Sequence, residues 1–239
     1  MHKKFKIMMA AVSLLSFSIT ADAAIALDRT RVIYTGNANS MSLTLSNDNA
    51  HNPYLAQSWL EDERGNKNNL PLVVTPALQR IEPSHRSMIR INPVSAAIGL
   101  PQDRESVFWL NVKEIPPKSE RSNVMQIALQ TRIKMFYRPT AIIPPKFSRW
   151  DDQLILTRTN KGYTVDNPTP YFMTIIAIRG ADKDAGAKGF QSTMIAPKSS
   201  GHIDSEHFKE PHLTTINDFG GKPTLAFHCT GEICKAKKQ

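Results

Sequence analysis

Short stretches in which apolar and polar residues alternate recur along most of this chain. Met41–Ser46, Phe108–Val112 and Leu154–Leu156 are examples, and turn-forming segments such as Glu63–Asn66 and Asn160–Gly162 separate them. Alternation with a period of two places apolar side chains on one face of a strand. Beyond the N-terminal segment, no stretch shows a sustained helical period. The pattern therefore predicts an all-β protein built from antiparallel sandwiches.

The length of 239 residues suits two domains of about 100 residues each. Three prolines interrupt the alternation in the segment 139–146, and proline stiffens a connection. We therefore expect a first sandwich over residues 24–138, a linker over 139–146 and a second sandwich over 147–239.

The N-terminus has the three parts of a secretory signal. Lys3, Lys4 and Lys6 are basic, Ile7–Ile19 is apolar and uncharged, and Ala21–Ala23 has the small-x-small pattern of a cleavage site. A membrane anchor is the alternative, but this apolar stretch is shorter than the roughly 20 residues that span a bilayer. We expect residues 1–23 to be a signal peptide and the mature chain to begin at Ala24.

Composition and charge indicate a folded, exported, basic protein. Hydrophobic residues make up 41% and charged residues 21% of the chain, which is typical of globular domains. The mature chain would keep 27 Lys and Arg against 20 Asp and Glu, a net charge of +7. A basic protein outside the cytoplasm meets other proteins and carboxylates, so we expect no nucleic-acid partner and no stable membrane insertion.

The only two cysteines, Cys229 and Cys234, lie close to the C-terminus. In an oxidising compartment this spacing favours a disulfide that closes a terminal hairpin. A metal site that includes His228 is the alternative, but C-x4-C with one adjacent histidine lacks the spacing of a zinc site. The C-x-x-C spacing of a thiol redox site is absent.

No motif predicts catalysis or a cofactor. The chain lacks the G-x-S-x-G, P-loop, G-x-G-x-x-G and H-E-x-x-H patterns. His202, His207 and His212 are evenly spaced, but strand geometry would place neighbours of this series on opposite faces, so we expect them in loops. The sequence therefore predicts a binding protein that is not an enzyme and needs no cofactor or metal.

The segment 123–137 alternates over its whole length, which predicts one strand. Its apolar face would carry Met125, Ile127, Leu129, Thr131 and Ile133. Two interpretations are open: the face lies in the core of the first sandwich, or part of it is exposed on an edge and available to another chain.

Seven blocks, in order along the chain, resemble the periplasmic pilus chaperones of Gram-negative bacteria. They are Ala26–Arg31, Leu100–Ser106, Ile115–Lys118, Gln126–Thr131, Ile133–Pro139, Asn167–Tyr171 and Ile216–Gly221. The resemblance implies two immunoglobulin-like domains in an L or boomerang arrangement with a cleft between them. It also implies a chaperone that caps incomplete pilus subunits, adhesins included, by donor-strand complementation and delivers them to an outer-membrane usher. The short connection before the predicted strand resembles the short-loop branch of the family.

The resemblance further assigns roles to particular residues. By matching position, Arg31 and Lys134 would hold the C-terminal carboxylate of the subunit. The donor-strand residues would be Met125, Ile127 and Leu129, and the interdomain ionic cluster would be Glu105, Arg138 and Asp218. An exposed stripe would also allow the empty chaperone to associate with itself.

One detail does not fit an unbroken strand. Lys134 has the opposite parity to Met125, Ile127 and Leu129, so simple alternation would direct it to the other face. Either a bulge intervenes or the carboxylate approaches along the edge of the strand. The competing function is a secreted two-sandwich adhesin or fibre component, but the chain lacks an alternating apolar extension before its first predicted strand.

Overall fold

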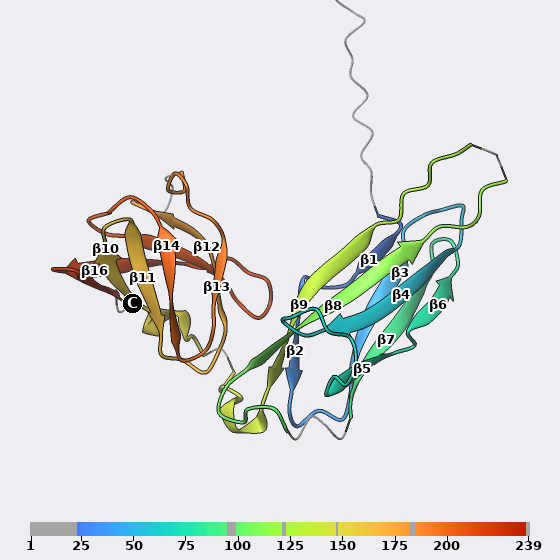
Figure 1. The fold of residues 1–239 in the computed structure, drawn as a ribbon, viewed down its shortest axis with the longest axis horizontal. Coiled ribbons are helices and arrows are strands. Elements are labelled where there is room, and N and C mark those ends of the chain that lie inside the picture. Colours follow the sequence, from blue (N-terminus) through green and yellow to red (C-terminus); the bar gives the residue numbers. More distant parts are fainter. Residues whose placement is uncertain (1–22, 95–98, 121–122, 147, 182–184, 238–239) are drawn as a thin grey trace, which may run out of the picture.

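A computed structural model describes residues 23–94, 99–120, 123–146, 148–181 and 185–237. The predicted signal peptide lies outside the described residues except for its last residue, Ala23. No helix in the described ranges is long and apolar enough to cross a membrane. Figure 1 shows two β-sandwiches that meet near the end of β9 and lie at an angle to each other, which confirms the predicted fold class.

Two sheets form the first sandwich. The smaller has the strand order β1-β3-β7-β5 and the larger has the order β2-β9-β8-β4-β6. Every pair is antiparallel except β2 with β9, which is parallel. The strands are β1 (Ile25–Leu27), β2 (Arg31–Thr35), β3 (Met41–Asn47), β4 (Tyr54–Glu61), β5 (Leu72–Thr75), β6 (Leu78–Ile81), β7 (Arg86–Pro93), β8 (Ser106–Ile115) and β9 (Gln130–Arg138).

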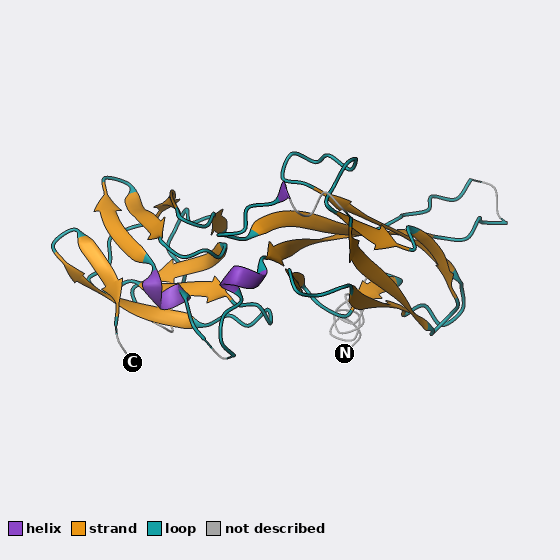
Figure 2. Ribbon diagram, turned by 90° about the horizontal axis from the view of Figure 1, so that it is seen from below, coloured by secondary structure: helices purple, strands orange, loops and turns teal. Residues whose placement is uncertain are grey.

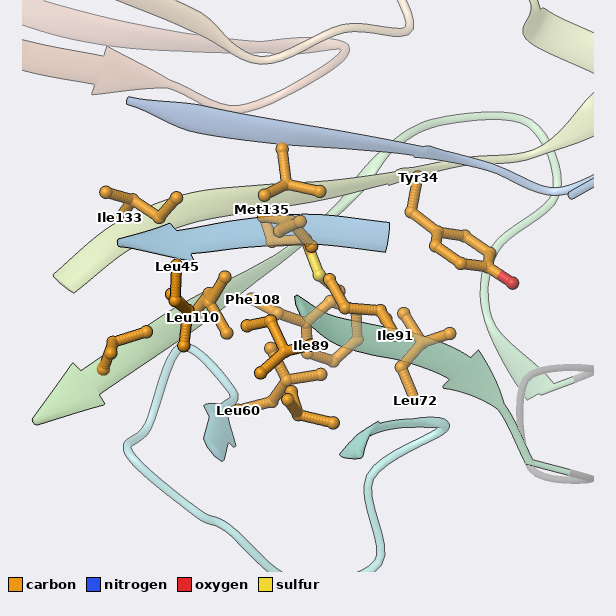
Figure 3. Packing of buried hydrophobic residues seen from close by; sticks show 14 of the residues in the cluster. Tyr34, Leu45, Leu60, Leu72, Ile89, Ile91, Phe108, Leu110, Ile133 and Met135 are labelled. Carbon is orange, nitrogen blue, oxygen red and sulfur yellow. The ribbon is translucent and has the colours of Figure 1, made fainter. Parts of the chain in front are cut away.

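The core of the first sandwich consists of the apolar faces that the alternation predicted. Leu45 on β3 and Leu110 on β8 are fully buried and approach each other between the sheets (Figure 3). Met135 on β9 and Tyr34 on β2 extend the same cluster. Each such side chain stabilises the fold by about 1.5 to 3 kcal/mol when it leaves water.

The second sandwich is a continuous ladder of eight strands, in the order β13-β12-β15-β16-β17-β10-β11-β14. The two layers are linked because β16 pairs with β15 through its first half and with β17 through its second half. The strands are β10 (Ile155–Thr159), β11 (Gly162–Asn167), β12 (Met173–Arg179), β13 (Thr193–Ile195), β14 (Ser199–Asp204), β15 (His212–Ile216), β16 (Thr224–Thr230) and β17 (Ile233–Ala236). Its separate core includes Leu156, Tyr163 and Phe227.

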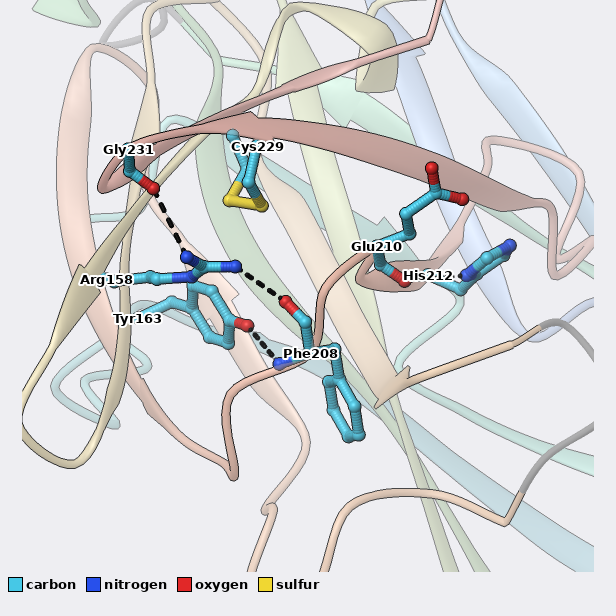
Figure 4. Close-up of a disulfide and its surroundings, with 8 residues drawn as sticks. Arg158, Tyr163, Phe208, Glu210, His212, Cys229 and Gly231 are labelled. Carbon is cyan, nitrogen blue, oxygen red and sulfur yellow. Dashed lines mark hydrogen bonds between the residues drawn. A yellow bond between two sulfur atoms is a disulfide. The ribbon is translucent and has the colours of Figure 1, made fainter.

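The predicted disulfide is confirmed. Cys229 and Cys234 are register partners on β16 and β17, and their sulfur atoms are bonded. Figure 4 shows the surroundings: the Arg158 guanidinium donates to the carbonyls of Gly231 and Phe208 at 3.2 and 2.8 Å. The disulfide and these bonds together hold the terminal hairpin against the sandwich.

The junction between the sandwiches is compact. The 3₁₀ turn Thr140–Ile142 lies there, and a second one, Asp151–Gln153, lies at the start of the second sandwich (Figure 2). The Tyr171 hydroxyl donates to the Ile142 carbonyl at 2.7 Å. Gly36 packs closely against the linker: an added Cβ would lie 3.0 Å from the Thr140 nitrogen, so a larger residue here would have to displace the linker backbone slightly.

Two local expectations were wrong. The strand predicted over 123–137 begins only at Gln130, because the paired part of β8 ends opposite that residue, at Lys113. Just before Gln130, the Glu114 amide of β8 still donates to the Leu129 carbonyl at 3.0 Å, but the register of the ladder itself starts at Gln130. The expectation of loop histidines holds for His207, but His202 lies in β14 and His212 in β15.

Candidate functional site

An exposed apolar stripe precedes β9. Met125, Ile127 and Leu129 are 88%, 69% and 38% exposed, whereas Ile133, further along the same alternation, is buried. The core interpretation is therefore wrong for the first three positions and correct for Ile133. Figure 1 shows the connection that carries the stripe extending away from the sandwich beyond β8. We call Met125, Ile127 and Leu129 the donor stripe.

The backbone edge next to the donor stripe is open. β9 lies between β8 and β2, but β2 pairs with it only from Lys134 onward. Residues 130–133 of β9 therefore have a neighbour on the β8 side alone within the described ranges. An unpaired edge presents N–H and C=O groups that can bind another strand. A strand added there would run toward the first residue of β2.

That first residue is Arg31, and its register partner on β9 is Lys134. Both side chains reach the second sandwich. Arg31 Nη1 donates to the Ile216 carbonyl at 3.3 Å, and Lys134 Nζ donates to the Thr174 hydroxyl at 3.2 Å. The two cations, which are 103 positions apart in the sequence, therefore lie side by side where the sandwiches meet.

Arg31 and Lys134 are partly buried positive charges that repel each other. Burial lowers the pKa of Lys134, and the neighbouring Arg31 lowers it further. Burial also lowers the pKa of Arg31, although Asp218 and Glu105 oppose this effect. The buried Nε of Arg31 has no hydrogen-bond partner among the described residues. An anion that approached both groups would find free donors and relieve their repulsion.

The register answers the question about the parity of Lys134. The pairing of β8 with β9 runs without a shift from Gln130 to Tyr137, so no bulge occurs there. Lys134 therefore lies on the face opposite to the buried Met135, together with its register partner Trp109. Its ammonium is 5.9 Å from the Trp109 ring centroid. At Lys134 itself both edges of β9 are paired, and the open edge ends one position earlier, at Ile133.

A cleft lies beside Arg31 between the two sandwiches. It measures about 530 Å³ and is lined from the first sandwich by residues 28–31, Ile33 and Met41, and from the second by Asp218 and Phe219. Phe219 is 93% exposed at the mouth of this cleft. The cleft therefore offers charged side chains and an exposed aromatic ring next to Arg31.

The structure brings Glu105, Arg138 and Asp218 together. Arg138 Nε donates to Glu105 at 2.8 Å, and its two terminal nitrogens donate to the Asp218 carboxylate at 2.7 and 3.0 Å. The Phe172 amide, from the second sandwich, donates to the other oxygen of Glu105 at 2.8 Å. Burial raises the pKa of Glu105, while Arg138 and the Phe172 amide oppose that effect. One guanidinium thus bonds to carboxylates of both sandwiches.

Sequence reasoning missed several residues of this region. Thr174, which binds Lys134, carries no pattern that distinguishes it from other strand threonines. Trp109 could have been found, because the alternation in Phe108–Val112 places this large aromatic ring on the polar face. The Arg132 guanidinium lies 4.0 Å from the centroid of that ring. Within the described ranges, no group of three or more His, Cys, Asp or Glu is arranged to hold a metal ion.

Two family models match the chain. One is described as "Pili and flagellar-assembly chaperone, PapD N-terminal domain" and matches residues 24–143. The other is described as "Pili assembly chaperone PapD, C-terminal domain" and matches residues 149–227. Together the two models cover the first sandwich and most of the second.

Individual relatives and solved structures are also similar. The chain is 48% identical to the chaperone protein PapD of Escherichia coli over 98% of either chain, and 44% identical to PmfD of Proteus mirabilis over 93% of this chain and 91% of PmfD. The structure of the periplasmic chaperone SfaE matches 84% of this chain and 98% of its own, with a TM-score of 0.69 and 32% identity. The Salmonella enterica SafA pilin in complex with the SafB chaperone gives a TM-score of 0.74 at 25% identity, over 88% of this chain and 98% of that one.

Proposed function

The chain belongs to the PapD family of pili assembly chaperones, and we propose that it caps pilus subunits by lending them its donor stripe as a strand. It is a periplasmic pilus chaperone whose partners are pilus subunits and the outer-membrane usher. The observation that carries the donor-strand mechanism is the exposure of Met125, Ile127 and Leu129 beside an open edge. Donor-strand complementation by pilus chaperones is itself a standard example of strand addition.

Apolar burial alone does not account for capture. The exposed parts of the donor stripe amount to about two side chains, worth roughly 3 to 6 kcal/mol when buried. Association costs about 4 to 15 kcal/mol in lost translational and rotational freedom. Main-chain hydrogen bonds along the open edge and an additional anchor must therefore contribute.

Arg31 and Lys134 supply that anchor for the C-terminal carboxylate of the subunit. A subunit strand that pairs with the open edge of β9 meets the start of β2 at Arg31, so its terminus stops beside both cations. Charge-assisted hydrogen bonds to a carboxylate are stronger than neutral ones. Because the anchor lies at a defined position along the edge, it also sets which subunit residues face Met125, Ile127 and Leu129.

The ionic cluster of Glu105, Arg138 and Asp218 keeps the two halves of the anchor together. Arg31 and Lys134 belong to the first sandwich, but their partners Ile216 and Thr174 belong to the second. A change in the angle between the sandwiches would separate these groups. The buried bonds of Arg138 to both sandwiches oppose such a change.

The remaining expectations complete the proposal. A signal peptide, cleaved after Ala23, would deliver the chain to the periplasm. The domains would comprise residues 24–138 and 147–239, with 139–146 as the linker. The protein would act by binding alone and catalyse no reaction, with no cofactor.

The test is the capture of a pilus subunit whose N-terminal extension has been removed. Mixed with the chaperone, this subunit should form a one-to-one complex in which hydrogen exchange slows in residues 123–133. A second subunit sample with an amidated C-terminus should bind at least tenfold more weakly. A complex without protection of residues 123–133 would contradict strand addition, and equal affinity of the two subunit samples would contradict the carboxylate anchor.

A further inference from the structure

Glu114 is a buried carboxylate without a cationic partner. It lies near the end of β8, on the core face, and is only 5% exposed. No lysine, arginine or histidine of the described residues forms an ion pair with it. A buried carboxylate in a sandwich core is costly unless positive charge or several donors satisfy it.

The donors that satisfy Glu114 come from two segments far apart in the sequence. One carboxylate oxygen accepts from the amides of Ala24 and Ile25 at 2.8 and 3.1 Å. The other oxygen accepts from the amide of Leu129 at 3.3 Å. The Glu114 backbone amide in turn donates to the Leu129 carbonyl at 3.0 Å. Glu114 thus joins the first residues of β1 to the end of the donor stripe.

We infer that Glu114 is the receptor for a new N-terminus, whose α-ammonium forms an ion pair with it and thereby fixes the base of the donor stripe. This inference rests on the proposed cleavage after Ala23. Hydrolysis of the Ala23–Ala24 peptide bond adds one water molecule, leaves a carboxylate on Ala23 and gives Ala24 a protonated amine. The nitrogen that becomes this ammonium already lies 2.8 Å from the carboxylate oxygen.

The surroundings allow the new charge to act on Glu114 rather than on another group. The register partner of Glu114 on β4 is Ala56, and that of Ile25 on β3 is Asn47, both uncharged. Asp48 contacts Ala24 through its backbone amide, which donates to the Ala24 carbonyl at 2.7 Å. Ala24 itself is 8% exposed, so water screens the pair weakly.

The consequence is that processing and activity are coupled. In the precursor, Ala24 offers Glu114 a neutral amide, whereas in the processed chain it offers a cation. The stronger bond holds the Glu114 side chain and, through its second oxygen, the Leu129 amide. The donor stripe then emerges from a rigid base, which favours a defined register with the subunit.

The experiment compares chains that differ only at the N-terminus. The first begins at Ala24 with a free amine, the second carries an acetyl group on Ala24, and each is also made with Glu114→Gln. Acetylation should increase the equilibrium constant for unfolding at least tenfold in the Glu114 chains and less than twofold in the Glu114→Gln chains. It should also accelerate hydrogen exchange of the Leu129 amide.

The pH dependence provides a second measurement that does not require the Glu114→Gln chains to fold. NMR titration should show the α-amine with a pKa at least one pH unit above its ordinary value of about 8. A cation whose pKa is raised by folding adds stability below the unfolded pKa and loses it as the pH rises through the folded one. The free-amine chain should therefore lose stability between about pH 8 and pH 10, and the acetylated chain should not.

Equal stability and equal Leu129 exchange in the free and acetylated chains would overturn the inference, as would an ordinary pKa of the α-amine. None of these measurements involves a subunit, so their outcome is independent of the donor-strand mechanism. N-terminal sequencing of the exported protein tests the cleavage itself. A start at Ala24 supports the inference, and any other start refutes it.

Discussion

The substitution Ile127→Glu tests most directly whether the donor stripe is a binding surface. Ile127 is 69% exposed, and burying that fraction of an isoleucine contributes about 1 to 2 kcal/mol to a complex. A glutamate at this position would lose that contribution and would place an unpaired carboxylate in an apolar groove, which costs several kcal/mol more. The expected loss therefore exceeds about 3 kcal/mol, or at least 100-fold in affinity.

The stability of the isolated protein should hardly change. An exposed position away from caps, ion pairs and the core usually tolerates substitution within about 0.5 kcal/mol. The assay combines denaturant unfolding of the chaperone alone with calorimetric titration of a pilus subunit that lacks its N-terminal extension. Met88→Glu is the matched control, because Met88 on β7 is 55% exposed but lies in the other sheet of the same sandwich. It should leave both quantities unchanged.

Two results would refute this reasoning. If Ile127→Glu binds the subunit within threefold of the wild type, the donor stripe does not enter the subunit. If Ile127→Glu instead unfolds several kcal/mol more easily while Met88→Glu does not, Ile127 is packed against the protein's own core in solution. Ile133→Glu shows the scale of that second outcome, because Ile133 is buried and its substitution should destabilise the fold severely.

Three further predictions concern the charged groups. Arg138→Ala should lower the free energy of unfolding by about 3 to 5 kcal/mol, because it leaves Glu105 buried without its cation; chemical denaturation measures this, and a change below about 1 kcal/mol would contradict the role of the cluster. Arg31→Ala and Lys134→Ala should each leave the fold intact but weaken binding of the free-acid subunit at least tenfold. Both variants should bind an amidated subunit as weakly as the wild-type protein does. If a variant still bound the free-acid subunit more tightly than the amidated one, the carboxylate anchor would lie elsewhere. Burial and Arg31 lower the pKa of Lys134 below 10.5, so the affinity for a free-acid subunit should be constant near neutral pH. The affinity should fall as the pH rises through the lowered pKa, because Lys134 then loses its charge. Calorimetric titration over this pH range measures the affinity, and an unchanged affinity would contradict the assignment.

Local patterns in the sequence determined much of the architecture. The period-two alternation identified strands such as β3 and β8 and the side chains that they bury, because a strand directs successive residues to opposite faces. The spacing of Cys229 and Cys234 identified the disulfide, since the two strands of a hairpin place such positions opposite each other. These features depend on neighbours in the sequence, so the sequence contains their signal.

The exposure of the donor stripe was decided by the tertiary structure. Alternation continues unchanged from Met125 to Ile133, yet the first position is exposed and the last is buried. The difference arises because β8 and the opposite sheet cover only the latter part of this segment. A periodic pattern shows which side chains share a face, but whether that face is covered depends on strands that are distant in the sequence.

The anchor and the ionic cluster likewise depend on distant pairings. Arg31 and Lys134 become neighbours through the parallel register of β2 with β9, and Arg138 meets Asp218 only because the two sandwiches pack against each other. Taken alone, each of these charges is indistinguishable from a solvated surface residue. Resemblance to a family suggested their roles, whereas the packing of the folded chain supplied the physical reason: it removes water from these charges and leaves them to interact with one another.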